Sequence, residues 1–148
     1  MDDPATISHQ IRVYKELRDA GASKHGAHTQ EARYLHKIIH RNEHIGAVVY
    51  GYSEGGFILL AATDKRIIYL DNKPLFTTVD ELSYDAVTGV KLVNVGLFAG
   101  VTLHTRVAEF SVRWVNVACA QQFVHYIETR RLEQSNTSQA LDTPRINT

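Results

Sequence analysis

The chain has 148 residues, of which 44% are hydrophobic and 22% are charged, and its 16 Lys and Arg balance 16 Asp and Glu. This length is typical of one globular domain, and the balanced charge argues against nucleic-acid binding, which needs a large positive field. A single cysteine, Cys119, excludes an internal disulfide, and the N-terminus has no apolar signal core, so we expect a cytoplasmic protein.

We expect residues 1–43 to form a helical N-terminal extension. The first helix is expected to be capped by Thr6 and to present one apolar face, formed by Ile7, Ile11, Tyr14 and Leu17. A second helix is expected to begin after Thr29 and to end near residues 41–42. Its apolar face should consist of Leu35, Ile38 and Ile39.

Three histidines, His36, His40 and His44, follow one another at intervals of four residues near the end of the second helix. Positions four apart share a face of a continuous helix and could ligate a transition metal. No acidic residue completes a metal-binding motif, so we interpret them as solvent-exposed histidines and expect neither a metal nor a cofactor.

From Ile45 onward the chain is rich in Val, Ile, Leu, Tyr and Thr, and turn residues interrupt it roughly every eight to twelve residues, as in all-β segments. The last strand alternates most clearly, and this alternation predicts that Trp114 lies in the core. The expected strands are Ile45–Ser53, Phe57–Ala62, Arg66–Leu70, Thr77–Tyr84, Val87–Val93, Val101–Thr105 and Glu109–Val115.

A final helix is expected after a capping Asn116, with an apolar stripe formed by Ala120, Phe123, Val124 and Ile127. Cys119 lies beside this stripe, and we interpret it as a small buried residue rather than a reactive thiol. Residues 133–148 lack an apolar pattern and are expected to form a disordered tail.

The segment Gly51-Tyr52-Ser53-Glu54-Gly55 matches the G-x-S-x-G pattern of hydrolase nucleophile elbows. Such an elbow needs a helix directly after the serine. Here the chain continues as FILLAA, TDK and RIIYLD, which predict two strands joined by a tight turn. We therefore interpret the motif as a hairpin turn, and a serine hydrolase that uses Ser53 is kept only as an alternative to be tested.

The segments TDKRIIYLD (63–71), LSYDAVTGVKLVNVGLFAGVTLHT (82–105) and NVACAQQFVHYIETRR (116–131) resemble, in this order, the bacterial pleckstrin-homology (PH) domains. The resemblance implies a mainly β, α+β fold over residues 44–132: a partly open barrel of about seven antiparallel strands capped by a C-terminal helix. It further implies a non-enzymatic binding or assembly module that acts through protein contacts, and a homo-oligomer, because some bacterial relatives form rings.

Two pairs of residues are candidates for an interface. Leu97 and Phe98 lie between two predicted strands, where turns normally carry polar residues, so they either fold back over the barrel end or contact a partner. Lys65 and Arg66 lie in the TDKR turn and could pair with charges at an interface.

A peripheral membrane-lipid-binding domain is the competing function. Eukaryotic PH domains that bind phosphoinositides resemble one another in a basic first hairpin, and anion binding needs several converging Lys or Arg side chains. This chain has no Lys or Arg between Ile45 and Asp64 and has Glu54 at the turn, so specific lipid head-group binding is disfavoured.

Overall fold

The computed structural model describes residues 4–23, 29–54, 56–72 and 77–142. The helices are α1 (Pro4–Asp19), α2 (Gln30–Ile38) and α3 (Val117–Asp142), and a 3-10 turn, η2 (Tyr84–Ala86), precedes β5. The strands are β1 (Ile45–Ser53), β2 (Gly56–Thr63), β3 (Ile67–Asn72), β4 (Thr77–Leu82), β5 (Val87–Val95), β6 (Phe98–Thr105) and β7 (Glu109–Asn116). Within the described ranges, no helix is both long and apolar enough to cross a membrane.

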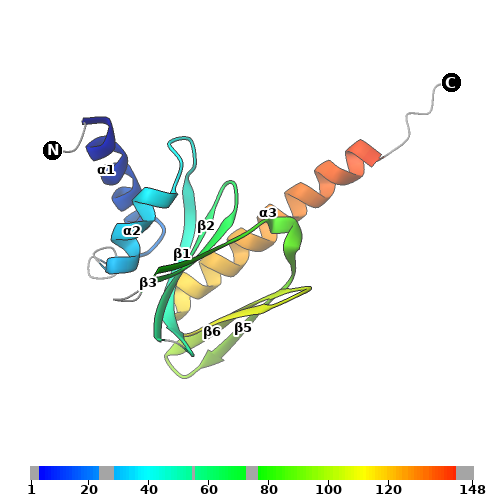
Figure 1. The fold of residues 1–148 in the computed structure, drawn as a ribbon. Coiled ribbons are helices and arrows are strands. Elements are labelled where there is room, and N and C mark those ends of the chain that lie inside the picture. Colours follow the sequence, from blue (N-terminus) through cyan, green and yellow to red (C-terminus); the bar gives the residue numbers. More distant parts are fainter. Residues whose placement is uncertain (1–3, 24–28, 55, 73–76, 143–148) are drawn as a thin grey trace.

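The strands form one antiparallel, seven-stranded sheet in the order β4-β3-β2-β1-β7-β6-β5. The sheet bends into two halves, β1–β4 and β5–β7, which are linked where Tyr52 of β1 pairs with Arg113 of β7. Helix α3 runs behind the space between the two halves (Figure 1). The predicted fold class is confirmed: this is a PH-like, mainly β architecture with a C-terminal helix.

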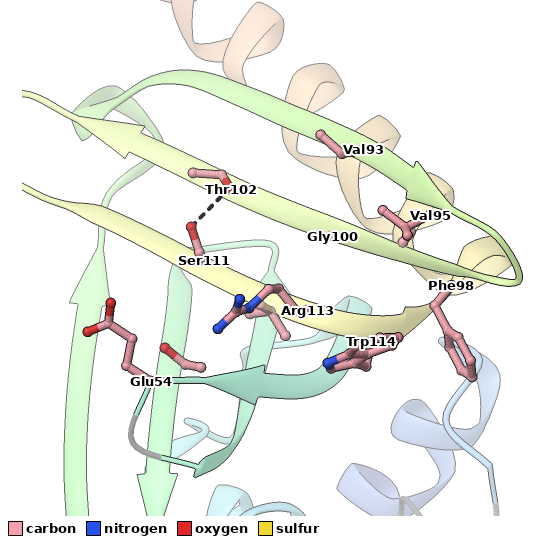
Figure 2. A pocket seen from close by; sticks show the side chains of 12 residues that line it. Glu54, Val93, Val95, Phe98, Gly100, Thr102, Ser111, Arg113 and Trp114 are labelled. Atoms are coloured by element: carbon pink, nitrogen blue, oxygen red, sulfur yellow. Dashed lines mark hydrogen bonds between the residues drawn. The ribbon is translucent and has the colours of Figure 1, made fainter.

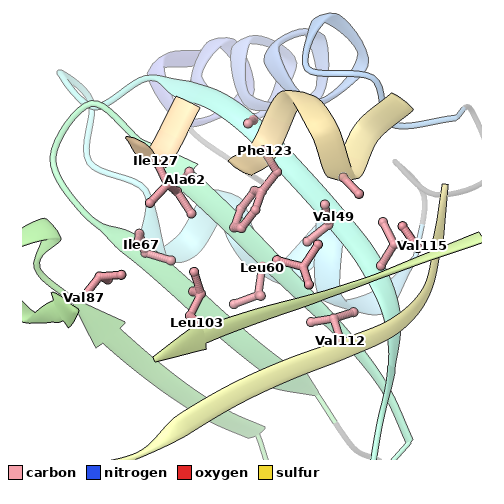
Figure 3. Packing of buried hydrophobic residues seen from close by; sticks show 14 of the residues in the cluster. Val49, Leu60, Ala62, Ile67, Val87, Leu103, Val112, Val115, Phe123 and Ile127 are labelled. Atoms are coloured by element: carbon pink, nitrogen blue, oxygen red, sulfur yellow. The ribbon is translucent and has the colours of Figure 1, made fainter. Parts of the chain in front are cut away.

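The main core lies between the two halves and α3 (Figure 3). Phe123 and Ile127 of α3 pack with Leu60 of β2 and with Leu103 and Val112 of the other half, and all of them are fully buried. The helix begins where the side-chain oxygen of its cap, Asn116, accepts a hydrogen bond from the backbone N–H of Cys119 at 3.2 Å. The predicted cap and apolar stripe of this helix are therefore confirmed.

A second core lies on the outer face of β1–β3, which α1 and α2 cover (Figure 1). Leu17 and Leu35 of the helices are buried together with Val48, Leu59 and Ile68 of the strands. Both faces of β2 are therefore buried, which explains why its sequence is a continuous apolar run instead of an alternating one.

The helical extension differs from the expected pattern in three respects. Helix α1 begins at Pro4, so Thr6 lies inside the helix and is not its cap. The helix buries Val13 and Leu17, whereas Ile7 and Ile11 are exposed. Two apolar stripes overlap on this short helix, and docking on the sheet selects the one that includes Val13. Helix α2 ends at Ile38, before the predicted end, because the backbone of Ile39 is already extended.

The expected disorder of residues 133–148 is wrong for the part of the tail that the structure describes. Helix α3 continues through Asp142, beyond the expected domain end at Leu132, and residues 143–148 lie outside the described range. Adding residues to an existing helix costs little because nucleation has already taken place, so an extension without an apolar face can stay helical. The first proline after this segment, Pro144, comes only after its end.

Trp114 does not lie in the core: its side chain is 59% exposed. Between the pairs Ala99↔Val115 and Val101↔Val112, β7 contributes two residues and β6 only Gly100. This extra residue is a β-bulge, and it moves all later side chains of β7 to the opposite face. The inward position expected for Trp114 is therefore taken by Val115.

Candidate functional site

The outer face of β5–β7 carries a groove of ≈ 450 Å³ that extends to the β1–β2 hairpin (Figure 2). On β6, Phe98, Gly100 and Thr102 alternate with buried residues such as Val101 and therefore point away from the core, and the buried Ala99 and Val112 also border the groove. This volume lies within the range of binding pockets in proteins. The groove is lined at one end by Val93, Val95, Phe98 and Trp114 and at the other by Thr102, Ser111, Arg113, Glu54 and Ser53.

The bulge in β7 builds the apolar end of this groove. Trp114 has a φ of 62°, and no other non-glycine residue in the described ranges has a positive φ. This left-handed conformation is sparsely populated by residues that carry a side chain. It directs the indole ring to the outer face, where it meets Phe98 edge to face, with 5.7 Å between ring centroids and an interplanar angle of 77°.

Gly51 of β1 makes room for the bulge. A Cβ atom at this position would lie 2.2 Å from the backbone oxygen of Arg113 and 2.5 Å from Val112, which no side chain could tolerate. Ser53, two residues later, pairs with Gly56 in the β1–β2 hairpin. Close packing explains the first glycine of the G-x-S-x-G pattern, Gly51, and the hairpin explains Ser53, so the hairpin interpretation is confirmed. The second glycine, Gly55, lies outside the described residues.

The β5–β6 hairpin ends in an apolar tip, as the sequence predicts. The tip turns at Gly96, whose φ of 61° favours glycine. Leu97 is 87% exposed, so the alternative in which it folds back over the barrel end is wrong. We call the exposed apolar residues at this end of the sheet the tip patch; they are Val93, Val95, Leu97, Phe98 and Trp114.

The opposite end of the groove is polar. The hydroxyl groups of Thr102 and Ser111 are hydrogen-bonded at 3.0 Å, as the dashed line in Figure 2 shows. Glu54 and Arg113 contribute one negative and one positive charge to the lining, and both side chains are exposed. The charges of the groove therefore balance, and its polar groups can orient an occupant without selecting a strongly charged one.

Val93, Val95, Gly100 and Arg113 were not among the residues singled out from the sequence. One signal for them is present in β5, where Leu92, Val93 and Val95 place apolar side chains on both faces of one strand. A strand with one face in water alternates instead. The bulge that exposes Trp114 has no comparable signal, because a tryptophan at positive φ is not marked by any turn residue.

Lys65 and Arg66 lie at the β2–β3 turn, and neither lines the groove. Thr63 shapes this turn by accepting hydrogen bonds from the backbone N–H groups of both residues. The side chain of Arg66 is only 13% exposed and donates to the Glu43 carboxylate at 2.9 and 3.0 Å, and it also pairs with Glu81. Arg66 therefore forms ion pairs within its own chain. Of the two candidates for an interface, only Lys65 is exposed.

Glu43 is the partner that holds Arg66 in place. Burial raises the pKa of its carboxyl group, but hydrogen bonds from Arg66, Thr63 and the backbone N–H of His40 outweigh burial and hold the pKa below its usual value. A buried carboxylate with this many donors stays ionised at neutral pH. The cluster links the loop before β1 to the β2–β3 turn.

The three spaced histidines do not come together. His36 and Gln10 are hydrogen-bonded through their side chains at 3.1 Å, whereas His44 contacts Glu16 at 2.6 Å. His40 follows the end of α2. Among the residues that the structure describes, no three His, Cys, Asp or Glu side chains are grouped so that they could hold a metal ion.

Cys119 is partly buried beside the loop that follows α1. Its thiol donates to the backbone oxygen of Gly21 at 3.4 Å, and burial raises the pKa of the thiol. A raised pKa lowers the fraction of nucleophilic thiolate, in agreement with the structural role expected for this residue.

Comparisons with known proteins identify the family. Residues 39–129 match the bacterial PH domain family. One similar solved structure is that of a DUF1696 family protein with a pleckstrin-homology domain from Shewanella loihica PV-4; it is 20% identical, covers 65% of this chain and 91% of that chain, and has a TM-score of 0.46. No curated protein matches the chain. The family match extends over more than half of the sequence and includes all seven strands and the packed part of α3, and the chain therefore belongs to the bacterial PH domain family.

Proposed function

We propose that this chain is a non-enzymatic assembly module that forms a homo-oligomer through its tip patch. Membership of the bacterial PH domain family is consistent with a non-enzymatic module, since PH-like families are generally non-catalytic. The groove supports a protein contact, because one end of it is lined by the apolar side chains Val93, Val95, Phe98 and Trp114.

One observation carries the proposal. The outer face of β1–β3 is covered by α1 and α2, whereas at the tip patch the outer face of β5–β7 exposes a cluster of large apolar side chains. Covering apolar surface is favourable by about 25 cal/mol per Å². Clusters of this kind mark interaction sites more often than single exposed residues do. A second copy of the chain supplies such a cover.

The test is the solution mass of the chain, measured by light scattering across the micromolar range. We expect the wild type to be larger than the monomer and the double variant Leu97→Asp/Phe98→Asp to be monomeric, because a buried unpaired charge is strongly unfavourable. Val107→Asp is the matched control. Val107 is an apolar residue that is 95% exposed, but it lies in the β6–β7 turn at the other end of β6.

A wild type that stays monomeric at all concentrations would refute the assembly proposal. A wild type that assembles while the tip variant keeps the same mass would leave assembly intact and exclude the tip patch as the contact. In that case Lys65→Glu tests the remaining exposed candidate. Circular dichroism spectra of all variants show whether they keep the fold.

A further inference from the structure

We infer that Leu97 of one copy inserts into the groove above Gly100 of a second copy, and that the contact is reciprocal across a two-fold axis. The inference rests on the proposed self-association and adds its geometry. It assigns two complementary parts to the same hairpin: a protruding residue, Leu97, and a hollow, which we call the Gly100 trough.

The Gly100 trough is a space in the sheet where a side chain is missing. A Cβ atom built on Gly100 would meet only backbone oxygens, that of Val112 at 3.7 Å and that of Val93 at 4.0 Å. Both distances are ordinary contacts, so the space above Gly100 is open. Figure 2 shows Gly100 on β6, with Val93 and Val95 on the neighbouring β5. Phe98 and Trp114 line the same apolar end of the groove.

Leu97 has the matching chemistry. It is an aliphatic side chain that is 87% exposed, and it lies on the tight turn between β5 and β6, where Gly96 has a φ of 61°. Because the turn fixes the backbone of Leu97, covering this residue has to order only its side chain.

The distance between the two parts suits a two-fold contact. Leu97, in the turn, comes three residues before Gly100 of β6, which is at most about 10 Å of extended chain. A two-fold axis that crosses the hairpin between them places Leu97 of each copy over Gly100 of the other. Phe98, which lies between them, packs edge to face on Trp114 of its own copy. In such an isologous contact every residue pair occurs twice, so one protruding residue and one trough per chain are sufficient.

The charges in the groove also favour a second copy as the occupant. Glu54 and Arg113 balance each other in the lining, and the chain as a whole has a formal net charge of zero. A strongly acidic or basic partner would find no opposite field here, whereas another copy brings an equally neutral, apolar surface.

Two single substitutions test the protruding residue and the Gly100 trough separately. Leu97→Ala shortens the protruding residue, and Gly100→Leu fills the trough with a side chain that the backbone accommodates. We expect each variant to dimerise with a dissociation constant at least tenfold above that of the wild type, roughly the loss for one or two buried methylene groups or a steric clash. If circular dichroism shows that Gly100→Leu does not fold, Gly100→Val blocks the trough with a smaller, strand-favouring side chain.

Mixing the two variants gives the decisive measurement. In a mixed dimer, Leu97 of the Gly100→Leu copy meets the open trough of the Leu97→Ala copy, which is the native contact. At the other contact, the shortened side chain at position 97 faces the enlarged one at position 100, so the two changes compensate each other. We expect the mixture to associate with a dissociation constant within about tenfold of the wild-type value, although neither variant associates well alone. Sedimentation velocity of the mixture, with one variant labelled, measures this directly.

The outcomes separate this inference from the proposal on which it rests. If the wild type is monomeric, both fail. If the wild type dimerises and Leu97→Asp/Phe98→Asp abolishes the dimer, but Gly100→Leu dimerises normally or the mixture does not recover, then the tip patch remains the contact and the insertion of Leu97 is wrong.

Discussion

Trp114 combines two unfavourable features, a positive φ and an exposed indole ring. A side chain held in this conformation costs on the order of 1–3 kcal/mol, and the surrounding structure has to compensate. The burial of Val115 compensates for this cost, because the bulge at Trp114 shifts the register of β7 and brings Val115 into the core. The aromatic ring that results at the surface is part of the tip patch, where it contacts Phe98.

We predict that Trp114→Gly leaves the monomer as stable as the wild type or stabilises it, because glycine adopts positive φ without strain. Trp114→Ala is the matched control, since it removes the same ring but keeps a Cβ atom. The glycine variant should unfold at a higher urea concentration than the alanine variant, by about 1 kcal/mol in unfolding free energy. Equal stability of the two variants would show that the backbone is relaxed at this position.

Glu43 is a buried charge on which the β2–β3 turn depends. Glu43→Gln leaves the guanidinium group of Arg66 without its buried carboxylate, and breaking such a pair costs about 3–5 kcal/mol. Glu81→Gln is the control, because Glu81 pairs with the same arginine but is 54% exposed, so its removal should cost less than about 1 kcal/mol. Urea denaturation at neutral pH measures both variants, and a similar cost for the two would contradict the prediction.

The same carboxylate makes stability depend on pH. The pKa of Glu43 in the folded chain is below the ordinary value of 4.5, so its contribution is fully present above that pH and is lost as the pH falls through the folded-state pKa. We therefore expect the stability difference between the wild type and Glu43→Gln to be constant near neutral pH and to shrink below pH 4.5. A difference that stays constant down to pH 3, about the lower end of carboxyl titration, would mean that another group holds the turn.

At the level of elements, α1 is fixed to the sheet by one face. Leu17 is 1% exposed and Ile11 is 63% exposed, although both belong to the same apolar periodicity in the sequence. We predict that Leu17→Ala lowers the unfolding free energy by about 2–5 kcal/mol and that Ile11→Ala changes it by less than about 0.5 kcal/mol. If Leu17→Ala does not change the unfolding free energy either, the helical extension does not unfold cooperatively with the sheet.

The strands were predictable because each follows a short-range pattern that turn residues interrupt. Alternation located β7, and the run FILLAA located β2, although only the structure shows that α1 and α2 cover its second face. The face of α1 was not predictable, since two stripes fit the spacing and docking selects one of them. Alternation alone places Trp114 on the wrong face of β7, because a single bulge shifts the register and the alternating pattern does not reveal such a shift.

The candidate site was predictable only in part. An apolar pair in a turn, Leu97 and Phe98, stands out in any sequence, and the structure places both at the hairpin tip. Arg66 was less predictable because the turn motif shows its charge but not its partner, Glu43, which lies 23 residues earlier in the chain. Pairings of this kind depend on the tertiary fold and leave no local pattern.

At the scale of the whole molecule, the charge distribution predicts weak interaction with anionic membranes. The chain has a formal net charge of zero, and the β1–β2 hairpin carries Glu54 but no Lys or Arg. We expect no head-group-specific sedimentation with phosphoinositide vesicles at physiological salt, since such binding needs a cluster of cations. Salt-sensitive binding that depends on the head group and is abolished by Lys65→Glu would overturn this expectation.

The position of the only tryptophan has a practical consequence. Trp114 is the single tryptophan of the chain, and its ring is 59% exposed within the tip patch. Indole emission moves to shorter wavelength when water leaves the ring, so the chain carries a built-in optical reporter at the surface proposed for assembly. Dilution of the unlabelled protein should shift its emission to longer wavelength as the copies separate. The protein concentration at the midpoint of that shift gives the dissociation constant of the contact without any added dye.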